Sequence, residues 1–247
     1  MKTNWRSVAL YYAIAVVLVI PFRLESLHPG WFESLPVFAK AVLSGYGPAI
    51  GAVIAMIVFR KEHRRTITVA GRSLLFSGLF FAVPILLIAG FGTDGSGISS
   101  RVGGLYTGLS LLAYCFLEEV GWRGFLQDAL KHVRTWQRVL ITAALWYLWH
   151  LSLFEFETSM NFLVSQLVFI AILVLGSWFI GKLTDDTRSI LVAAGAHSLF
   201  NVFSYLQVDT GRKLLIAGGS LVCWMVLAKM MPAQAGKITP RTQPVQG

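Results

Sequence analysis

Two adjacent glutamates and an arginine lie inside an apolar stretch of this sequence. Glu119 and Arg123 are four residues apart, so in a helix they share one face and can form an ion pair. Glu118 lies about 100° further around the helix and has no such partner there. A structural Glu–Arg pair near the helix end, with Glu118 facing the lipid headgroups, leaves this second carboxylate unexplained. An ionised carboxylate in a low-dielectric site needs a proton or a partner from another helix, and this setting favours a general base.

Two further apolar stretches contain polar side chains spaced four residues apart. Trp146 and His150 share a helical face, so the indole can shelter the imidazole; a tryptophan belt at the membrane edge is an equally good interpretation. His197 and Asn201 also share a face. Both can donate hydrogen bonds to an oxyanion, and either could ligate a metal. The competing interpretation is that they bridge membrane helices.

These three segments become a site only if their helices converge. Of the five histidines, only His150 and His197 fall inside apolar stretches. A hydrophilic pocket formed by three helices would bring Glu118, His150, His197 and Asn201 together. We therefore expect a hydrolytic site made of these four residues, because convergence reduces the cost of burying each of them.

The composition of the chain requires a membrane. Of its 247 residues, 55% are hydrophobic and only 13% are charged, about half the charged fraction of a soluble domain. Mean hydropathy is +0.66. These values exclude a soluble domain, a disordered chain and a nucleic-acid-binding protein. Cys115 and Cys223 both lie in apolar stretches, which excludes a disulfide-stapled secreted fold.

Eight stretches approach the roughly 20 apolar residues that a helix needs to cross a bilayer. They are Trp5–Phe22, Pro36–Phe59, Ser73–Phe91, Gly104–Leu130, Val139–Phe154, Asn161–Gly181, Ile190–Leu206 and Leu214–Met231. The sequence predicts an all-α polytopic membrane protein of about eight transmembrane helices with a polar intramembrane active-site cavity. Residues 1–231 form one transmembrane domain, and the polar tail 232–247 is predicted to be disordered.

The basic residues predict the orientation of the chain. With the N-terminus inside, 15 lysines and arginines are cytoplasmic and 5 lie on the opposite side, with Arg123 within the fourth stretch. This is the positive-inside pattern for both termini in the cytoplasm, and we expect the plasma (inner) membrane. The first stretch is followed by Pro21-Phe22-Arg23 instead of a small-x-small cleavage site, which favours a retained anchor.

The three polar segments resemble, in order, the signature of the CPBP family. This family comprises CAAX proteases and bacteriocin-processing proteins, is also called Abi, and includes the eukaryotic CAAX prenyl endopeptidase. Glu118-Glu119-x-x-x-Arg123-Gly124-x-Leu126 resembles its first motif. The second motif usually opens with phenylalanine, whereas Trp146 stands here, and we expect this difference to alter packing more than chemistry. The resemblance covers roughly Tyr106 to Phe203, within a protease-like core of about 104–206.

The resemblance implies an intramembrane endopeptidase acting on a membrane-associated peptide or protein in the lipid bilayer. Glu118 would activate a water that His150 helps to hold and polarise. His197 and Asn201 would stabilise the oxyanion, and Glu119 and Arg123 would support the site. The substrate would be of the prenylated CAAX type or a leader or sorting peptide.

The resemblance leaves the need for a metal open, with either no cofactor or one divalent ion such as zinc. The family is often described as metalloproteases, and His150, His197 and Glu118 could bind zinc with a water position left open. The His-Glu-x-x-His motif of zincins is missing from the sequence, which favours a metal-free site.

Three other functions use the same residues differently. A non-catalytic membrane binding or bacteriocin-immunity protein could use the same polar pocket, because fold similarity does not prove activity. A transporter would also place polar groups on membrane helices, but the sequence shows no inverted repeat. A cysteine protease could use Cys115, whose apolar flanks disfavour the thiolate.

Overall fold

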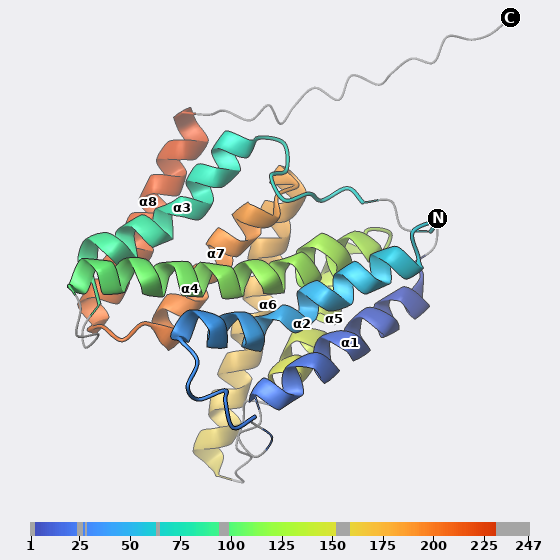
Figure 1. The fold of residues 1–247 in the computed structure, drawn as a ribbon. Helices are drawn as coiled ribbons and strands as arrows, with labels where there is room; N and C mark the ends of the chain where they lie inside the picture. Colours follow the sequence, from blue (N-terminus) through green and yellow to red (C-terminus); the bar gives the residue numbers. More distant parts are fainter. Residues whose placement is uncertain are drawn as a thin grey trace, which may run out of the picture.

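The computed structural model describes residues 3–23, 27, 29–62, 65–93, 99–151 and 159–230. In these residues the chain forms eight α-helices and one π-helix (Figure 1). The elements are α1 (Trp5–Arg23), α2 (Val37–Val58), α3 (Leu74–Phe91), α4 (Ser100–Gly121), η2 (Trp122–Gln127), α5 (Thr135–His150), α6 (Met160–Thr187), α7 (Ile190–Tyr205) and α8 (Thr210–Met230). The predicted all-α fold of eight helical segments is confirmed. The tail 232–247 lies outside the described residues.

Five helices, α1, α2, α3, α6 and α8, are long and apolar enough to cross a bilayer. Helix α7 is a shorter apolar helix, α5 has 16 residues, and α4 carries the two glutamates of the candidate site. These helices identify an integral membrane protein, and the helices that carry the polar segments are the shorter or less apolar ones.

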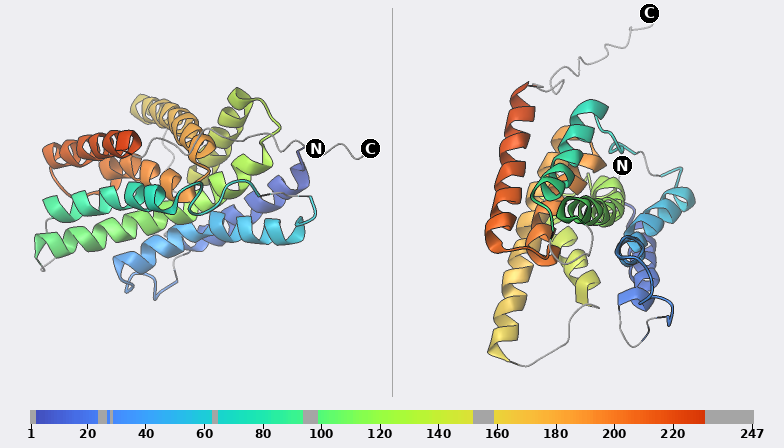
Figure 2. Two further views of the ribbon diagram at one scale, coloured as in Figure 1. Left: turned by 90° about the horizontal axis from the view of Figure 1, so that it is seen from above. Right: turned by 60° about the vertical axis from the view of Figure 1, so that its left-hand side comes forward.

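Helices α1, α2 and α4 lie side by side, and α3 covers another side of α4 (Figures 1 and 2). Helix α1 faces the protein through a stripe of Val8, Tyr11, Ala15 and Val19, none more than 5% exposed. Their spacing of three and four residues places them on one face. Helix α4 also packs on α7, and its continuation η2 contacts α5, α6 and α7.

The end of α4 approaches α2 closely at Gly121. A Cβ atom there would lie 2.7 Å from the carbonyl oxygen of Pro48, so only glycine fits without displacing α2. Immediately afterwards the chain enters the π-helix η2, and all six of its residues are buried. Single π-helical turns inside α-helices often occur at functional sites, and the sequence pattern had given no sign of this one.

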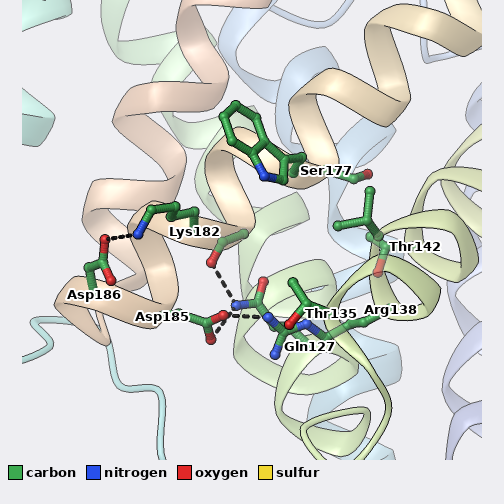
Figure 3. A pocket seen from close by; sticks show the side chains of 11 residues that line it. Gln127, Thr135, Arg138, Thr142, Ser177, Lys182, Asp185 and Asp186 are labelled. Atoms are coloured by element: carbon green, nitrogen blue, oxygen red, sulfur yellow. Dashed lines mark hydrogen bonds and ion pairs between the residues drawn. The ribbon is translucent and has the colours of Figure 1, made fainter.

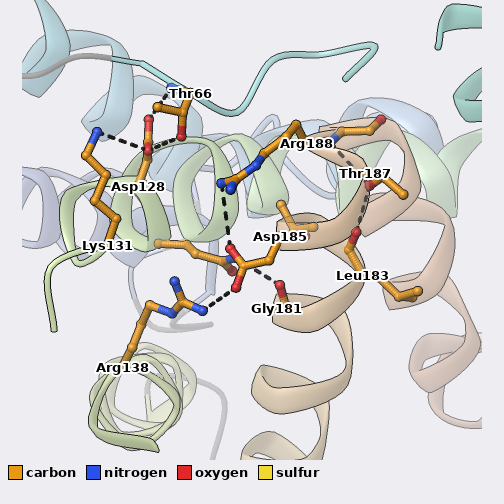
Figure 4. A network of polar contacts seen from close by, with 12 residues as sticks. Thr66, Asp128, Lys131, Arg138, Gly181, Leu183, Asp185, Thr187 and Arg188 are labelled. Carbon is orange, nitrogen blue, oxygen red and sulfur yellow. Dashed lines mark hydrogen bonds and ion pairs between the residues drawn. The ribbon is translucent and has the colours of Figure 1, made fainter. Parts of the chain in front are cut away.

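The loop before α3 ties the end of η2 to the start of α7, and its contact with Asp128 is shown in Figure 4. The backbone N–H and the hydroxyl of Thr66 each donate to the Asp128 carboxylate at 2.6 Å. The N–H of Ile190 donates to the Thr68 carbonyl at 3.0 Å, beside an isolated β-bridge between Thr68 and Ser189. These bonds fix the two segments that carry the candidate site relative to each other.

Replacing Gly71 tests whether this loop stabilises the fold through its contacts with Asp128 and with the start of α7. Gly71 has a φ of +62°, and a Cβ atom would overlap the Thr187 carbonyl oxygen. We expect Gly71→Ala to lower the free energy of unfolding by more than about 1 kcal/mol, measured by denaturant titration in detergent micelles. Gly78→Ala is the matched control, because nothing lies within 4 Å of a Cβ there. Equal stability of the two variants would contradict a stabilising role for this loop.

Candidate functional site

Glu118 is fully buried on α4, and one of its oxygens is held by two indole groups. Its Oε2 accepts hydrogen bonds from Trp122 Nε1 at 3.3 Å and from Trp146 Nε1 at 3.0 Å. Its Oε1 has no hydrogen-bond partner among the described residues. Glu118 therefore faces the protein interior. The local partner that sequence reasoning missed is Trp122, four residues further along the chain.

Glu119 and Arg123 form the predicted ion pair. Arg123 Nη1 lies 3.0 Å from Glu119 Oε1, and neither side chain is more than 1% exposed. Arg123 Nη2 also donates to the Gly176 carbonyl at 3.4 Å, and its guanidinium lies 4.8 Å from the centroid of the Trp146 ring. Removing one member of a buried pair leaves an uncompensated charge and typically costs 3–5 kcal/mol, so this pair also holds α4, α5 and α6 together.

His197 on α7 lies between Glu119 and Asn201. Its Nδ1 is 2.8 Å from Glu119 Oε1, which suits an ion pair when the ring is protonated. The atom is nevertheless not aligned for a regular N–H···O bond, because no hydrogen bond satisfies it. Its Nε2 lies 3.5 Å from Asn201 Nδ2, which also contacts Cys115 Sγ at 3.3 Å. The predicted common face of His197 and Asn201 therefore points toward α4.

Trp146 connects the polar groups of all three segments. Beyond its bond to Glu118, its ring centroid lies 5.0 Å from that of His197 and 6.1 Å from that of His150. The expectation that a tryptophan here would alter packing more than chemistry was incomplete. An indole N–H donates to the buried carboxylate, and a phenylalanine could not supply that bond.

His150 reaches the cluster at the Trp146 ring, as the shared helical face predicted. Its Nδ1 lies 2.8 Å from the carbonyl oxygen of Trp146. Donation from Nδ1 to this carbonyl makes Nε2 the basic nitrogen. The imidazole meets Trp149 and Phe169 edge-on, with centroids 5.0 and 5.2 Å away, so aromatic rings fix its orientation.

Unused hydrogen-bonding capacity is concentrated in this cluster. Six buried side-chain atoms in the described part of the chain have no hydrogen-bond partner. Five of them are Tyr11 Oη, Glu118 Oε1, Glu119 Oε2, Arg123 Nε and His197 Nδ1, and the sixth is Ser177 Oγ. Buried polar groups in proteins are normally paired. A cluster of unpaired ones can bind a water molecule and the peptide group of a substrate.

The possible metal ligands do not form a ready binding set. The described residues contain no group of three or more His, Cys, Asp or Glu side chains that could hold a metal ion. One Glu118 oxygen faces two indole donors, and one Glu119 oxygen faces Arg123. His150, His197 and Glu118 are therefore not arranged as a three-ligand set in the described part of the chain.

Two cavities lie beside the cluster. One, of about 270 Å³, opens between α5 and α6 and is lined by polar residues including Gln127, Thr142 and Ser177 (Figure 3). Ser177 follows Gly176, whose carbonyl binds Arg123. The other, of about 370 Å³, is more apolar and lies between α2, α4 and the end of α7. Glu118 lines neither of these two cavities.

The fold and the buried cluster define a helical integral membrane protein with a buried polar site. Residues 100–203 match the family described as type II CAAX prenyl endopeptidase Rce1-like. This segment, from α4 to α7, is similar to the Rce1-like family, which confirms the resemblance and supports a protease of the CAAX type. It contains all six predicted site residues. A comparison with curated proteins found no match.

Sequence reasoning missed two side chains of the cluster. Trp122 occupies an unspecified position of the first motif, although its spacing from Glu118 allows an i,i+4 contact. Tyr11 lies on α1, more than 100 residues before the first motif. A tyrosine on the buried face of a membrane helix would have indicated it. That face can be identified only once the packing of α1 is known.

Trp146→Phe tests the indole–carboxylate bond. The variant keeps an aromatic ring and removes a charge-assisted hydrogen bond worth about 1.5–3 kcal/mol. Trp149→Phe is the matched control, because its indole donates to the neutral carbonyl of Ala15 at 3.2 Å, a bond worth about 0.5–1.5 kcal/mol. We expect Trp146→Phe to lower the free energy of unfolding more, measured by denaturant titration in micelles. Equal losses would argue against a charged acceptor.

Proposed function

We propose that the protein is an intramembrane endopeptidase that hydrolyses a peptide bond of a membrane-associated substrate with a water molecule activated by Glu118. The observation that carries this proposal is the unpaired Oε1 of Glu118. This buried carboxylate oxygen lies in a cluster that also contains an unpaired Arg123 Nε and His197, whose Nδ1 contacts Glu119 without a regular hydrogen bond. The Rce1-like match over residues 100–203 supports the same class of reaction.

In the proposed reaction, Glu118 Oε1 takes a proton from the water as its oxygen bonds to the substrate carbonyl carbon. The carbonyl π electrons move to the carbonyl oxygen and give a tetrahedral oxyanion. When this intermediate collapses, the C–N bond breaks and the leaving nitrogen takes the proton from Glu118. Atoms and charges then balance, and the products are a carboxylic acid and an amine.

The indoles of Trp122 and Trp146 prepare the carboxylate for this role. Both hold Oε2, so the carboxylate cannot rotate freely and Oε1 is the oxygen that faces the remaining polar groups. A base held in one orientation loses less entropy on reaching the transition state. His150, whose Nδ1 faces a carbonyl, presents a basic Nε2 that would help to hold and polarise the water.

His197 and Asn201 are the proposed hydrogen-bond donors to the oxyanion. Their side chains lie together on α7, and donors placed before the reaction stabilise the developing charge without reorganisation. Glu119 and Arg123 would act as positioning residues, because Glu119 contacts His197 at 2.8 Å and is itself held by Arg123 at 3.0 Å.

The proposed substrates are prenylated CAAX-type proteins or leader- or sorting-type peptides associated with the bilayer. We propose a location in the plasma (inner) membrane with both termini in the cytoplasm, supported by the distribution of basic residues. A binding or immunity protein with the same pocket would bind such peptides without cleaving them, which the following experiment distinguishes.

Glu118→Gln is the direct test of the proposed base. The amide keeps the shape of the side chain but cannot accept the proton, so we expect cleavage to fall about 10²–10⁴-fold. The assay uses full-length protein in vesicles with two internally quenched peptides, one prenylated at a CAAX-type C-terminus and one of the leader type. Glu62→Gln is the control, because Glu62 is exposed on a loop. Cleavage unchanged by Glu118→Gln would contradict the proposal.

Prolonged dialysis against a chelator tests the metal-free form of the reaction. Because the described residues offer no group of three metal ligands, we expect cleavage of the same peptides to be unchanged after dialysis. Metal analysis of the purified protein would accompany the assay. Loss of activity on dialysis, restored by a stoichiometric divalent ion, would contradict the metal-free form and leave the assignment of an endopeptidase intact.

A further inference from the structure

Tyr11 brings a polar group to the site from outside the segment that matches the Rce1-like family. It lies on α1 and is fully buried, whereas the match begins at residue 100. Its hydroxyl has no hydrogen-bond partner among the described residues. A tyrosine hydroxyl buried in a protein usually finds a partner, so an unpaired one calls for an explanation.

The ring of Tyr11 is fixed against the aromatic wall of the site. It meets Trp122 edge-on with centroids 5.9 Å apart and lies 5.0 Å from the ring of Phe125. Trp122 is the residue whose indole holds Glu118 Oε2. One turn further along α1, the carbonyl of Ala15 accepts the indole N–H of Trp149 at 3.2 Å, which anchors α1 to α5.

Tyr11 packs beside the charged residues of the candidate site. Its ring meets Trp122, which directly precedes Arg123 and whose indole holds Glu118. An unpaired donor on Tyr11 and an unpaired acceptor on Glu118 Oε1 thus belong to one buried cluster. A single water placed between them would satisfy both, because buried waters typically make two to four hydrogen bonds to polar groups.

We propose that Tyr11 is a catalytic residue whose hydroxyl donates a hydrogen bond to the water activated by Glu118. This inference rests on the proposed function and assigns a role to α1. The water donates one proton to Glu118 Oε1 and accepts the Tyr11 hydrogen bond at one lone pair, so its second lone pair points at the substrate carbonyl. Tyr11 itself stays protonated throughout, and the electron balance of the reaction is unchanged.

Tyr11→Phe isolates this hydroxyl, with Tyr12→Phe as the matched control. Tyr12 is the next residue of the same helix and points about 100° away. We expect Tyr11→Phe to lower kcat about 100-fold, the order of effect that follows from misplacing a reacting group, and to leave KM unchanged. We expect Tyr12→Phe to change neither constant. The assay uses full-length protein in vesicles and the prenylated CAAX-type peptide.

Stability separates a catalytic hydroxyl from a structural one. Because Tyr11→Phe removes a buried hydroxyl that has no protein partner, its Tm in detergent should equal or exceed that of the unmodified protein. A lower Tm combined with an unchanged kcat would overturn the proposal and make the hydroxyl structural. If Glu118→Gln is inactive while Tyr11→Phe is fully active, only the role of Tyr11 fails. If Glu118→Gln is fully active, the proposed function itself fails.

An infrared measurement tests the shared water without any substrate. The difference spectrum between the unmodified protein and Glu118→Gln identifies the carboxyl band of Glu118. We expect Tyr11→Phe to shift this band, because the water on Oε1 loses a donor, and Tyr12→Phe to leave it in place. A band that Tyr11→Phe does not move would overturn the proposal even if neither peptide is cleaved.

Discussion

The structure depends on burying two adjacent carboxylates inside a membrane protein. Desolvating an ionised carboxylate is costly unless it is paired and hydrogen-bonded. Glu119 meets this requirement with the guanidinium of Arg123. Glu118 meets it with two indole N–H groups on a single oxygen. The second arrangement supplies hydrogen bonds without a full positive charge, so it stabilises the carboxylate and still leaves one oxygen able to accept a proton.

The surrounding helices and one loop hold the two buried glutamates in place. Gly121 allows α4 to lie against α2 immediately after the glutamates, and η2 buries Trp122 and Arg123 directly beyond them. The loop that contains Thr66 and Thr68 ties the end of η2 to the start of α7. The separation of the glutamates from His197 is therefore held by these contacts together with the direct packing of α4 on α7.

The matched segment contains the proposed base, the ion pair and the proposed oxyanion donors, and helix α1 packs against them from outside this segment. Tyr11, Ala15 and their neighbours on the buried stripe pack against η2 and α5. The aromatic rings of Trp122, Trp146 and Trp149 form the wall between these helices. A low-dielectric aromatic wall strengthens the electrostatic interactions it encloses, which suits both the buried ion pair and a single reactive water.

The sequence alone determined the helical membrane fold, the approximate helix bounds and the Glu119–Arg123 pair. These features follow from hydrophobic stretches and four-residue spacing, which are local properties of the chain. It could not show that Glu118 accepts bonds from Trp122 and Trp146, that η2 is a π-helix, or that Tyr11 joins the cluster. Those features depend on how helices far apart in the sequence cross and on which face each one buries, and only tertiary packing decides this.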